Sequence, residues 1–81
     1  MNLPRLPALT AVDVIKALKR AGFVFDRHAK GSHEIYYNPA TKRRTTVPNH
    51  PGTTLPRGTL RAIIKQAGLT RDEFLRFLKK K

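Results

Sequence analysis

The residues of this chain that are best suited to chemistry are three histidines and the small residues around one of them. His33 follows Lys30-Gly31-Ser32 and opens a strand-like run that continues to Tyr37. His28 and His50 lie on either side of it in the sequence. The reference pKa of histidine is about 6.5, so an imidazole can take up and release a proton near neutral pH. His33 is therefore the first candidate for a catalytic acid or base.

The residues before His33 suit a substrate that contains phosphate. Gly31 permits a sharp turn and the close approach of a phosphate, Ser32 offers a hydroxyl or a backbone N–H, and Lys30 offers positive charge. RNA can be cleaved without a metal, because its own 2′-hydroxyl can attack the neighbouring phosphate. The reaction needs a base near that hydroxyl, positive charge at the phosphate and an acid for the leaving 5′-oxygen. His28 and His50 are the candidates for the acid.

Each histidine also has a purely structural interpretation. Strand alternation places His33 on the same face as Ile35 and Tyr37, so it could simply pack at the margin of a sheet. His50 could stabilise a proline-rich loop through a hydrogen bond, and His28 could be an exposed residue at a strand end. The residue pattern alone leaves these alternatives open.

The acidic residues disfavour metal-dependent chemistry. The chain has 5 of them, most of which are expected in helix caps or beside strand turns, whereas a two-metal nuclease needs several convergent carboxylates. No pair of histidines has the i, i+4 spacing of a helical metal site. The sequence therefore predicts no metal site and no cofactor.

Composition indicates a small domain that attracts polyanions. The chain has 81 residues, no cysteine, and 17 Lys+Arg against 5 Asp+Glu, for a formal net charge of +12. This balance predicts attraction to RNA, DNA, an anionic membrane or an acidic protein, and it favours nucleic acid or an acidic partner. No apolar run reaches the roughly 20 residues of a membrane-spanning helix, and no membrane partner is expected. The lack of cysteine is compatible with a cytoplasmic location.

Three helices are predicted from capping signals and apolar spacing. Thr10-Ala11-Val12-Asp13 forms a capping box before a helix at about 11–21. A second apolar stripe at helical spacing predicts a helix at about 57–67, ended by Gly68. A further capping box, Thr70-Arg71-Asp72-Glu73, opens a third, short helix.

Three short strands are predicted between the first two helices, at about 23–28, 32–37 and 41–47. Strands joined by short turns form an antiparallel meander, which helices can cover on one face while the other stays open. We therefore expect an α+β fold in the order α-β-β-β-α, plus a short C-terminal helix. This is the order of double-stranded-RNA-binding domains. It would form one domain over 10–81, preceded by an irregular lead over 1–9.

Three blocks of the sequence resemble one protein family. The blocks are Ala17-Leu18-Lys19-Arg20-Ala21-Gly22-Phe23, Lys30-Gly31-Ser32-His33-Glu34-Ile35-Tyr36, and Thr46-Val47-Pro48-Asn49-His50-Pro51 continued by 55–69. In this order and at this spacing, over roughly residues 12–75, they resemble the HicA-type toxins of bacterial toxin–antitoxin pairs.

The resemblance implies a fold, an activity and a partner. It implies a small mRNA-cleaving ribonuclease with a fold like that of double-stranded-RNA-binding domains, in which His33 matches the catalytic histidine. It also implies a HicB-type antitoxin that covers the active site. The proline-containing lead and the longer C-terminal helix depart from the shortest family members without touching the three blocks.

The cationic side chains expected to hold RNA lie in the third strand and the second helix. They are Lys42, Arg43, Arg44, Arg57, Arg61 and Lys65. The last three recur at i, i+4 and i+8 and so form one stripe, which would follow phosphates without reading bases. The same stripe could be an ordinary solvated helix face.

The sequence thus predicts a metal-independent endoribonuclease that cleaves mRNA, with His33 as the essential acid/base. Gly31, Ser32, Lys30 and His50 are the candidates for catalytic support. The alternative is a non-catalytic RNA-binding module that uses the same basic face. A DNA-binding regulator is disfavoured, because no helix-turn-helix signal is present.

Overall fold

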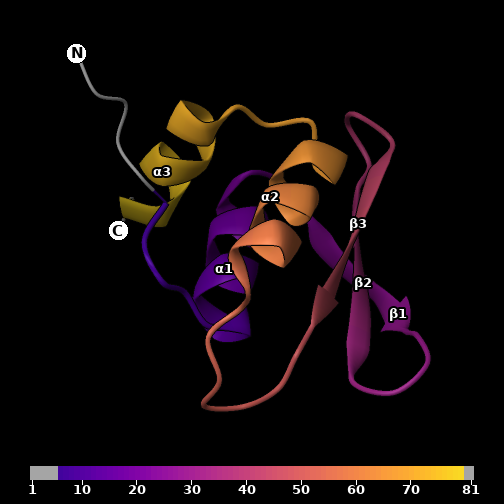
Figure 1. The fold of residues 1–81 in the computed structure, drawn as a ribbon. Coiled ribbons are helices and arrows are strands. Elements are labelled where there is room, and N and C mark those ends of the chain that lie inside the picture. The colour runs from indigo at the N-terminus through magenta and orange to yellow at the C-terminus, as the bar shows by residue number, and fades with distance from the viewer. Residues whose placement is uncertain (1–5, 80–81) are drawn as a thin grey trace.

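Within residues 6–79, six regular elements follow one another in the order α1-β1-β2-β3-α2-α3 (Figure 1). The computed structural model describes residues 6–79. The elements are α1 (Ala11–Arg20), β1 (Val24–His28), β2 (His33–Asn38), β3 (Arg43–Pro48), α2 (Arg57–Gln66) and α3 (Arg71–Lys79). The predicted α+β class and element order are confirmed. Residues 1–5 of the expected lead over 1–9, and residues 80–81 of the expected domain over 10–81, lie outside the described residues.

The three strands form one antiparallel sheet in the order β1-β2-β3, so β2 is the central strand. His33 pairs with Pro48 at one end of the β2–β3 ladder, and Asn38 pairs with Arg43 at the other. The two hairpin turns therefore lie at opposite ends of the sheet, and the residues near each turn are separated by the length of β2.

The two faces of the sheet differ in what covers them. Figure 1 shows the helices on one face of the sheet. Tyr36 and Asn38 are 3% and 6% exposed and belong to the buried, helix-covered face. His33, Ile35 and Tyr37 alternate with them along β2 and therefore lie on the open face. The predicted placement of His33 on the same face as Ile35 and Tyr37 is thus observed.

The strands begin one or two residues later than the sequence predicts. The N–H of Phe23 donates to the carbonyl of Leu18 (2.9 Å), so Phe23 closes the end of α1 instead of joining the ladder. Lys42 has a φ of 62°, which is a turn conformation and not a strand one. At both positions, a backbone hydrogen bond within the neighbouring turn replaces the strand pairing that the sequence predicts.

Helix α1 begins at the predicted capping box. The backbone N–H of Thr10 donates to Asp13 Oδ2 (3.1 Å), and the N–H of Asp13 donates to the Thr10 hydroxyl (3.3 Å). Five side chains of α1 are buried, at the spacing of one helix face. Gly22 follows at a φ of 106°, which favours glycine, and the Asn38 amide packs against it.

Helix α2 is attached to the sheet through β3. It has no side-chain cap at Pro56, and Leu60, Ile63 and Ile64 face the core. The Thr45 hydroxyl donates to the carbonyl of Ile63 (3.2 Å). The N–H of Thr46 donates to Gln66 Oε1 (3.3 Å), so α2 also satisfies a donor of the edge strand.

Helix α3 packs against α1 and completes the core. Its capping box is formed as predicted, with the N–H of Thr70 donating to Glu73 Oε1 (2.8 Å). Phe74 is fully buried. At the other end, Arg20 Nη1 donates to the carbonyls of Phe77 (2.9 Å) and Leu78 (3.1 Å). These carbonyls belong to the last turn of α3, where an arginine is favourable.

The described part of the N-terminal lead, residues 6–9, contains no helix or strand but is packed into the molecule. Leu6 and Leu9 are each 7% exposed and belong to the core. The carbonyl of Leu9 accepts from the N–H of Leu55 (2.7 Å), and Thr10 forms an isolated bridge with Thr54. The lead therefore joins α1 to the loop that precedes α2.

Candidate active site

A glycine turn presents His33 at the start of β2. Gly31 has a φ of 69°, and a Cβ there would meet no atom within 4 Å, so the backbone conformation and not space favours glycine. The N–H of Ala29 donates to the carbonyl of His33 (2.8 Å) and closes the hairpin. The geometry explains why a small flexible residue stands two positions before the histidine.

The imidazole of His33 lies open on the uncovered face of the sheet. The residue is exposed, and within residues 6–79 its side chain has no hydrogen bond or ion pair. Pro48 lies opposite it on β3, and Ile35 and Tyr37 follow it along the same face. A substrate can therefore reach this ring without displacing another part of the described chain.

The second histidine of the predicted site lies beside the same turn. The hydroxyl of Ser32 is 3.1 Å from Nε2 and 3.4 Å from Nδ1 of His50. The tautomer of the ring decides which partner donates. The N–H of Asn49 donates to the carbonyl of Ser32 (3.0 Å) and continues the contact between the two segments. The fold thus brings the segment that carries His50 into contact with Ser32, at the end of the sheet where His33 begins β2.

A carboxylate network that the sequence interpretation missed anchors the loop next to His50. Tyr36 Oη donates to Glu34 Oε1 (2.7 Å), and Asn49 Nδ2 donates to Glu34 Oε2 (2.9 Å). The hydrogen bond from Tyr36, then that from Asn49, holds the pKa of Glu34 below its ordinary value. Burial, followed by the same bond to Glu34, raises the pKa of Tyr36, which keeps its hydroxyl a donor. The i, i+2 spacing of Glu34 and Tyr36 on one strand face was the available signal.

Three predicted RNA-binding cations lie at the other end of the sheet. Lys42 stands in the β2–β3 turn and Arg43 pairs with Asn38, whereas His33 begins β2. The first and last residues of β2, His33 and Asn38, are five residue steps apart, which is about 17 Å at 3.3–3.4 Å per residue. The structure therefore does not bring this group together with the histidine.

Arg44 is held on the open face by its neighbours. Its guanidinium lies 4.4 Å from the centroid of the Tyr37 ring, and its Nε is 3.6 Å from Asp26 Oδ2. The register of β1 shifts between Phe25 and Arg27, so Asp26 occupies a bulge. Both contacts are partly exposed and contribute modestly to stability.

The remaining candidates occupy separate places. Lys30 is exposed in the Gly31 turn, and Arg57, Arg61 and Lys65 are exposed along α2. His28 ends β1, where its ring meets that of Phe25 with centroids 5.1 Å apart. The α2 side chains thus form a second cationic surface, on a different element from His33.

Two further classes of site have no support among residues 6–79. No group of three or more His, Asp or Glu side chains there could hold a metal ion. No helix in this part of the chain is long and apolar enough to cross a membrane.

Residues 11–69 match the family model described as the HicA toxin of bacterial toxin–antitoxin systems. No curated protein matches the chain. The matched segment runs from the start of α1 to the residue after Gly68, so it includes the whole sheet, Ser32, His33, His50 and α2. Leu6 of the lead and all of α3 lie outside it.

Proposed function

The chain belongs to the HicA toxin family, and from this premise we propose that it is an endoribonuclease that inhibits translation by cleaving mRNA. Family membership makes it the toxin of a bacterial toxin–antitoxin pair and implies a HicB-type antitoxin as partner. The observation that supports cleavage most directly is the contact of 3.1 Å between His50 Nε2 and the hydroxyl of Ser32, the residue that precedes His33 in the chain.

The proposed reaction uses the 2′-hydroxyl of the RNA as nucleophile. His33 takes the proton from this hydroxyl while the 2′-oxygen forms a bond to phosphorus. The bond from phosphorus to the 5′-oxygen breaks, and His50 gives a proton to that oxygen. The products are a 2′,3′-cyclic phosphate and a 5′-hydroxyl, and no metal ion takes part.

The residues around His33 have supporting roles in this reaction. Lys30 stabilises the charge that develops on the phosphate oxygens, and Gly31 allows the phosphate to approach the backbone. Ser32 orients His50 through the contact described above. Glu34 and Asn49 are positioning residues, because they hold the segment that carries His50 without facing the substrate.

The test is incubation of the purified protein with a defined single-stranded RNA in EDTA, with analysis of the new 3′ ends. Cleavage by the wild type is expected to leave cyclic phosphates. His33→Ala should slow cleavage by about 10²- to 10⁴-fold, the usual contribution of general acid–base catalysis. The exposed His28→Ala is the matched control and should cleave at nearly the wild-type rate, with circular dichroism to show that each variant is folded.

Two outcomes would contradict the proposal. Undiminished cleavage by His33→Ala would remove the acid/base role of this residue. Loss of wild-type cleavage in EDTA, with recovery on addition of a divalent cation, would show a metal-dependent reaction.

A non-catalytic RNA-binding module is the second candidate function. The observation that favours it is that no described residue orients the His33 ring, whereas catalytic bases usually have such a partner. This alternative predicts salt-sensitive RNA binding and intact RNA after long incubation. It also predicts that His33→Ala changes affinity alone.

A further inference from the structure

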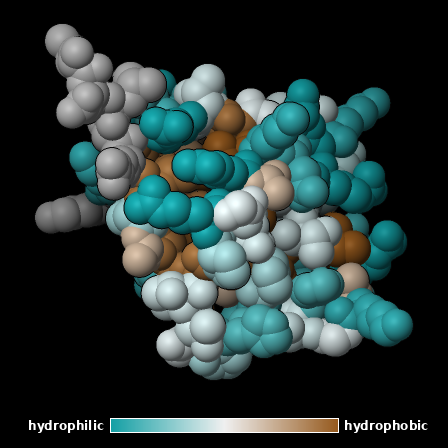
Figure 2. All heavy atoms as spheres, viewed as in Figure 1, coloured by the Kyte–Doolittle hydropathy of each residue, from teal (hydrophilic) through white to brown (hydrophobic). Residues whose placement is uncertain are grey.

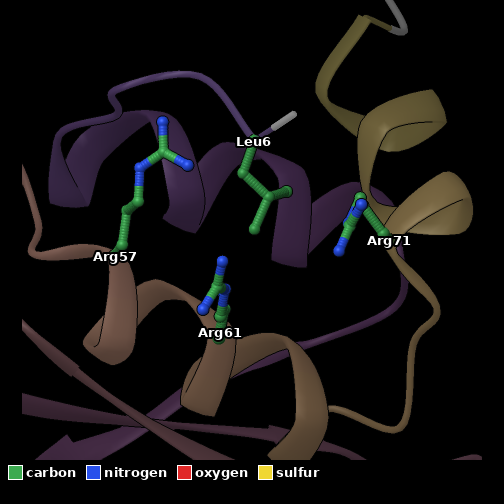
Figure 3. Close-up of a pocket in the computed structure, with 4 residues that line it drawn as sticks. All are labelled: Leu6, Arg57, Arg61 and Arg71. Carbon is green, nitrogen blue, oxygen red and sulfur yellow. The ribbon is translucent and has the colours of Figure 1, made fainter. Parts of the chain in front are cut away.

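A cationic groove lies on the helical side of the molecule, between α2, the start of α3 and the lead. Its main part is a cavity of about 350 Å³ lined by Leu6, Arg57, Arg61 and Arg71. Figure 3 shows Leu6 and Arg61 facing each other across this space, with Arg57 and Arg71 on either side. An adjoining cavity of about 220 Å³ shares Leu6, Arg61 and Arg71 and continues along α2 to Lys65. We call the two together the arginine groove.

The described chain does not neutralise the positive charge of Arg57 and Arg61. Neither side chain has a hydrogen bond or an ion pair with any residue in 6–79. Most carboxylates of the protein are engaged elsewhere, in helix caps, an ion pair and the Tyr36 network. These engaged residues are Asp13, Asp26, Glu34 and Glu73. Because no described residue offsets the charge of Arg57 and Arg61, these two side chains repel each other and a bound anion would stabilise the groove.

We propose that the arginine groove binds phosphate groups of an RNA strand. A guanidinium presents its donors in a planar fork that matches the oxygens of a phosphate and can bind them in pairs. The largely buried Leu6 side chain forms an apolar wall, which strengthens the electrostatic attraction at the contact. The groove follows α2 from Arg57 to Lys65, about 12 Å at 1.5 Å per residue. This length suits successive groups of a strand better than one isolated carboxylate.

The groove is a binding site that is separate from the catalytic candidates. It is lined by the lead, α2 and α3, and no described lining residue belongs to the sheet that carries His33. Leu6 and Arg71 also lie outside the segment 11–69 that matches the family. The groove therefore combines α2, which lies inside that segment, with the lead and α3, which lie outside it, and it would hold RNA while another part of the strand reaches His33. In this respect the inference rests on the proposed function.

The test measures RNA binding in a protein that carries His33→Ala, so that cleavage cannot interfere. A fluorescently labelled single-stranded RNA is titrated by anisotropy against this protein with and without Arg61→Gln. We expect Arg61→Gln to weaken binding about tenfold, the effect of one lost charge-assisted contact. Lys16→Gln removes the same charge from an exposed position on α1 and should change binding less than about twofold. Equal losses of RNA affinity in Arg61→Gln and Lys16→Gln, or no loss in either, would overturn the proposal that the groove binds RNA.

Two forms of the same RNA, with and without a 5′-phosphate, distinguish binding of a terminal phosphate from binding of backbone phosphates. If binding depends on a 5′-phosphate and Arg61→Gln removes that dependence, the groove holds a strand end. If RNA with and without the 5′-phosphate binds equally and loses affinity equally, the groove holds backbone phosphates. In a third outcome, Arg61→Gln leaves RNA binding unchanged but weakens binding of a polyglutamate peptide. That result would assign the groove to an acidic protein and overturn the RNA proposal.

Failure of the proposal that the groove binds RNA can be distinguished from failure of the proposal that the protein cleaves RNA. In a protein that retains His33, Arg61→Gln should raise KM for RNA cleavage and leave kcat nearly unchanged, because it removes binding remote from the reacting atoms. If the wild type cleaves RNA and Arg61→Gln changes neither the KM for RNA nor the RNA affinity, the groove proposal is wrong and the nuclease proposal is retained. If no cleavage occurs but Arg61→Gln weakens RNA binding selectively, the groove stands and the nuclease is wrong.

Discussion

His33 and Glu34 are neighbours in the sequence, but their side chains lie on opposite faces of β2 and have opposite surroundings. His33 is exposed and has no described side-chain partner, which suits a group that must exchange protons with a substrate. Glu34 accepts hydrogen bonds from Tyr36 and Asn49. A charged carboxylate that accepts such bonds is stabilised more strongly than a neutral group would be. We therefore infer that Glu34 stabilises the structure around the proposed site and does not transfer protons.

Glu34→Gln is expected to destabilise the folded protein at neutral pH by about 1 kcal/mol, because a neutral amide accepts hydrogen bonds less strongly and Glu34 is partly exposed. The folded-state pKa of Glu34 lies below its ordinary value of 4.5. The stabilisation is therefore complete above pH 4.5 and is lost as the pH falls through the lower folded-state pKa. Urea unfolding of both proteins over a pH series measures the effect, and the difference should shrink on acidification. A difference that grows as the pH falls would contradict this assignment.

The helices differ in how their ends are satisfied. α1 and α3 begin at capping boxes, whereas α2 begins at Pro56 without a side-chain cap. Gly68 follows the C-cap residue of α2, has a φ of 75° and packs against the side chain of Arg43. This position places a cation near the C-terminal carbonyls of α2, where the helix dipole favours it. It also explains why Arg43, a predicted RNA-binding residue, packs against a helix end.

Gly68→Ala is expected to lower the free energy of unfolding by about 1–2 kcal/mol, because an alanine is strained in the left-handed region. The added Cβ would also displace the Arg43 side chain. Gly58→Ala is the matched control within α2, since Gly58 has no positive φ and a Cβ there meets no atom within 4 Å. It should raise the free energy of unfolding by about 0.5–1 kcal/mol. Chemical denaturation measures both, and shifts of the same sign would contradict the interpretation.

The molecule as a whole places the proposed active site and the proposed RNA-binding groove on different layers. The open face of the sheet carries His33, and the helical layer carries the arginine groove, where the lead and α3 meet α2. Figure 2 shows hydrophilic side chains over much of the face seen in Figure 1, with apolar atoms visible between them around α3. With a formal net charge of +12, the protein should attract polyanions from many directions before a specific contact forms.

RNA binding by the His33→Ala protein is expected to weaken steeply with salt. Each phosphate neutralised on a single strand contributes about −0.7 to the slope of log K against log salt, so four contacts in the groove give about −2.8. Between 50 and 200 mM salt this corresponds to a loss of about 50-fold. Anisotropy titrations at several salt concentrations measure the slope, and Arg61→Gln should reduce it by about 0.7. A flat dependence would show that phosphate contacts do not dominate binding.

The family and the order of the elements could be predicted from the sequence because their signals are local. The capping boxes at Thr10 and Thr70 link residues three positions apart, and the turns at Gly31 and Gly68 depend on the backbone freedom of single residues. Apolar spacing identified the buried face of each helix. The strand limits were less accurate, because the turn bonds of Phe23 and Lys42 compete with the ladder.

The composition of the sites depended on contacts between residues far apart in the chain. Ser32 meets His50 across 18 positions, and Glu34 meets Asn49 across 15. The arginine groove requires Leu6, Arg61 and Arg71 from three separate segments to converge. Local chain stiffness and backbone hydrogen bonds carry no information on such distances, which are set by how the helices pack on the sheet. Histidine and glycine could therefore be recognised as reactive and flexible in the sequence, but their partners became defined only when the core had formed.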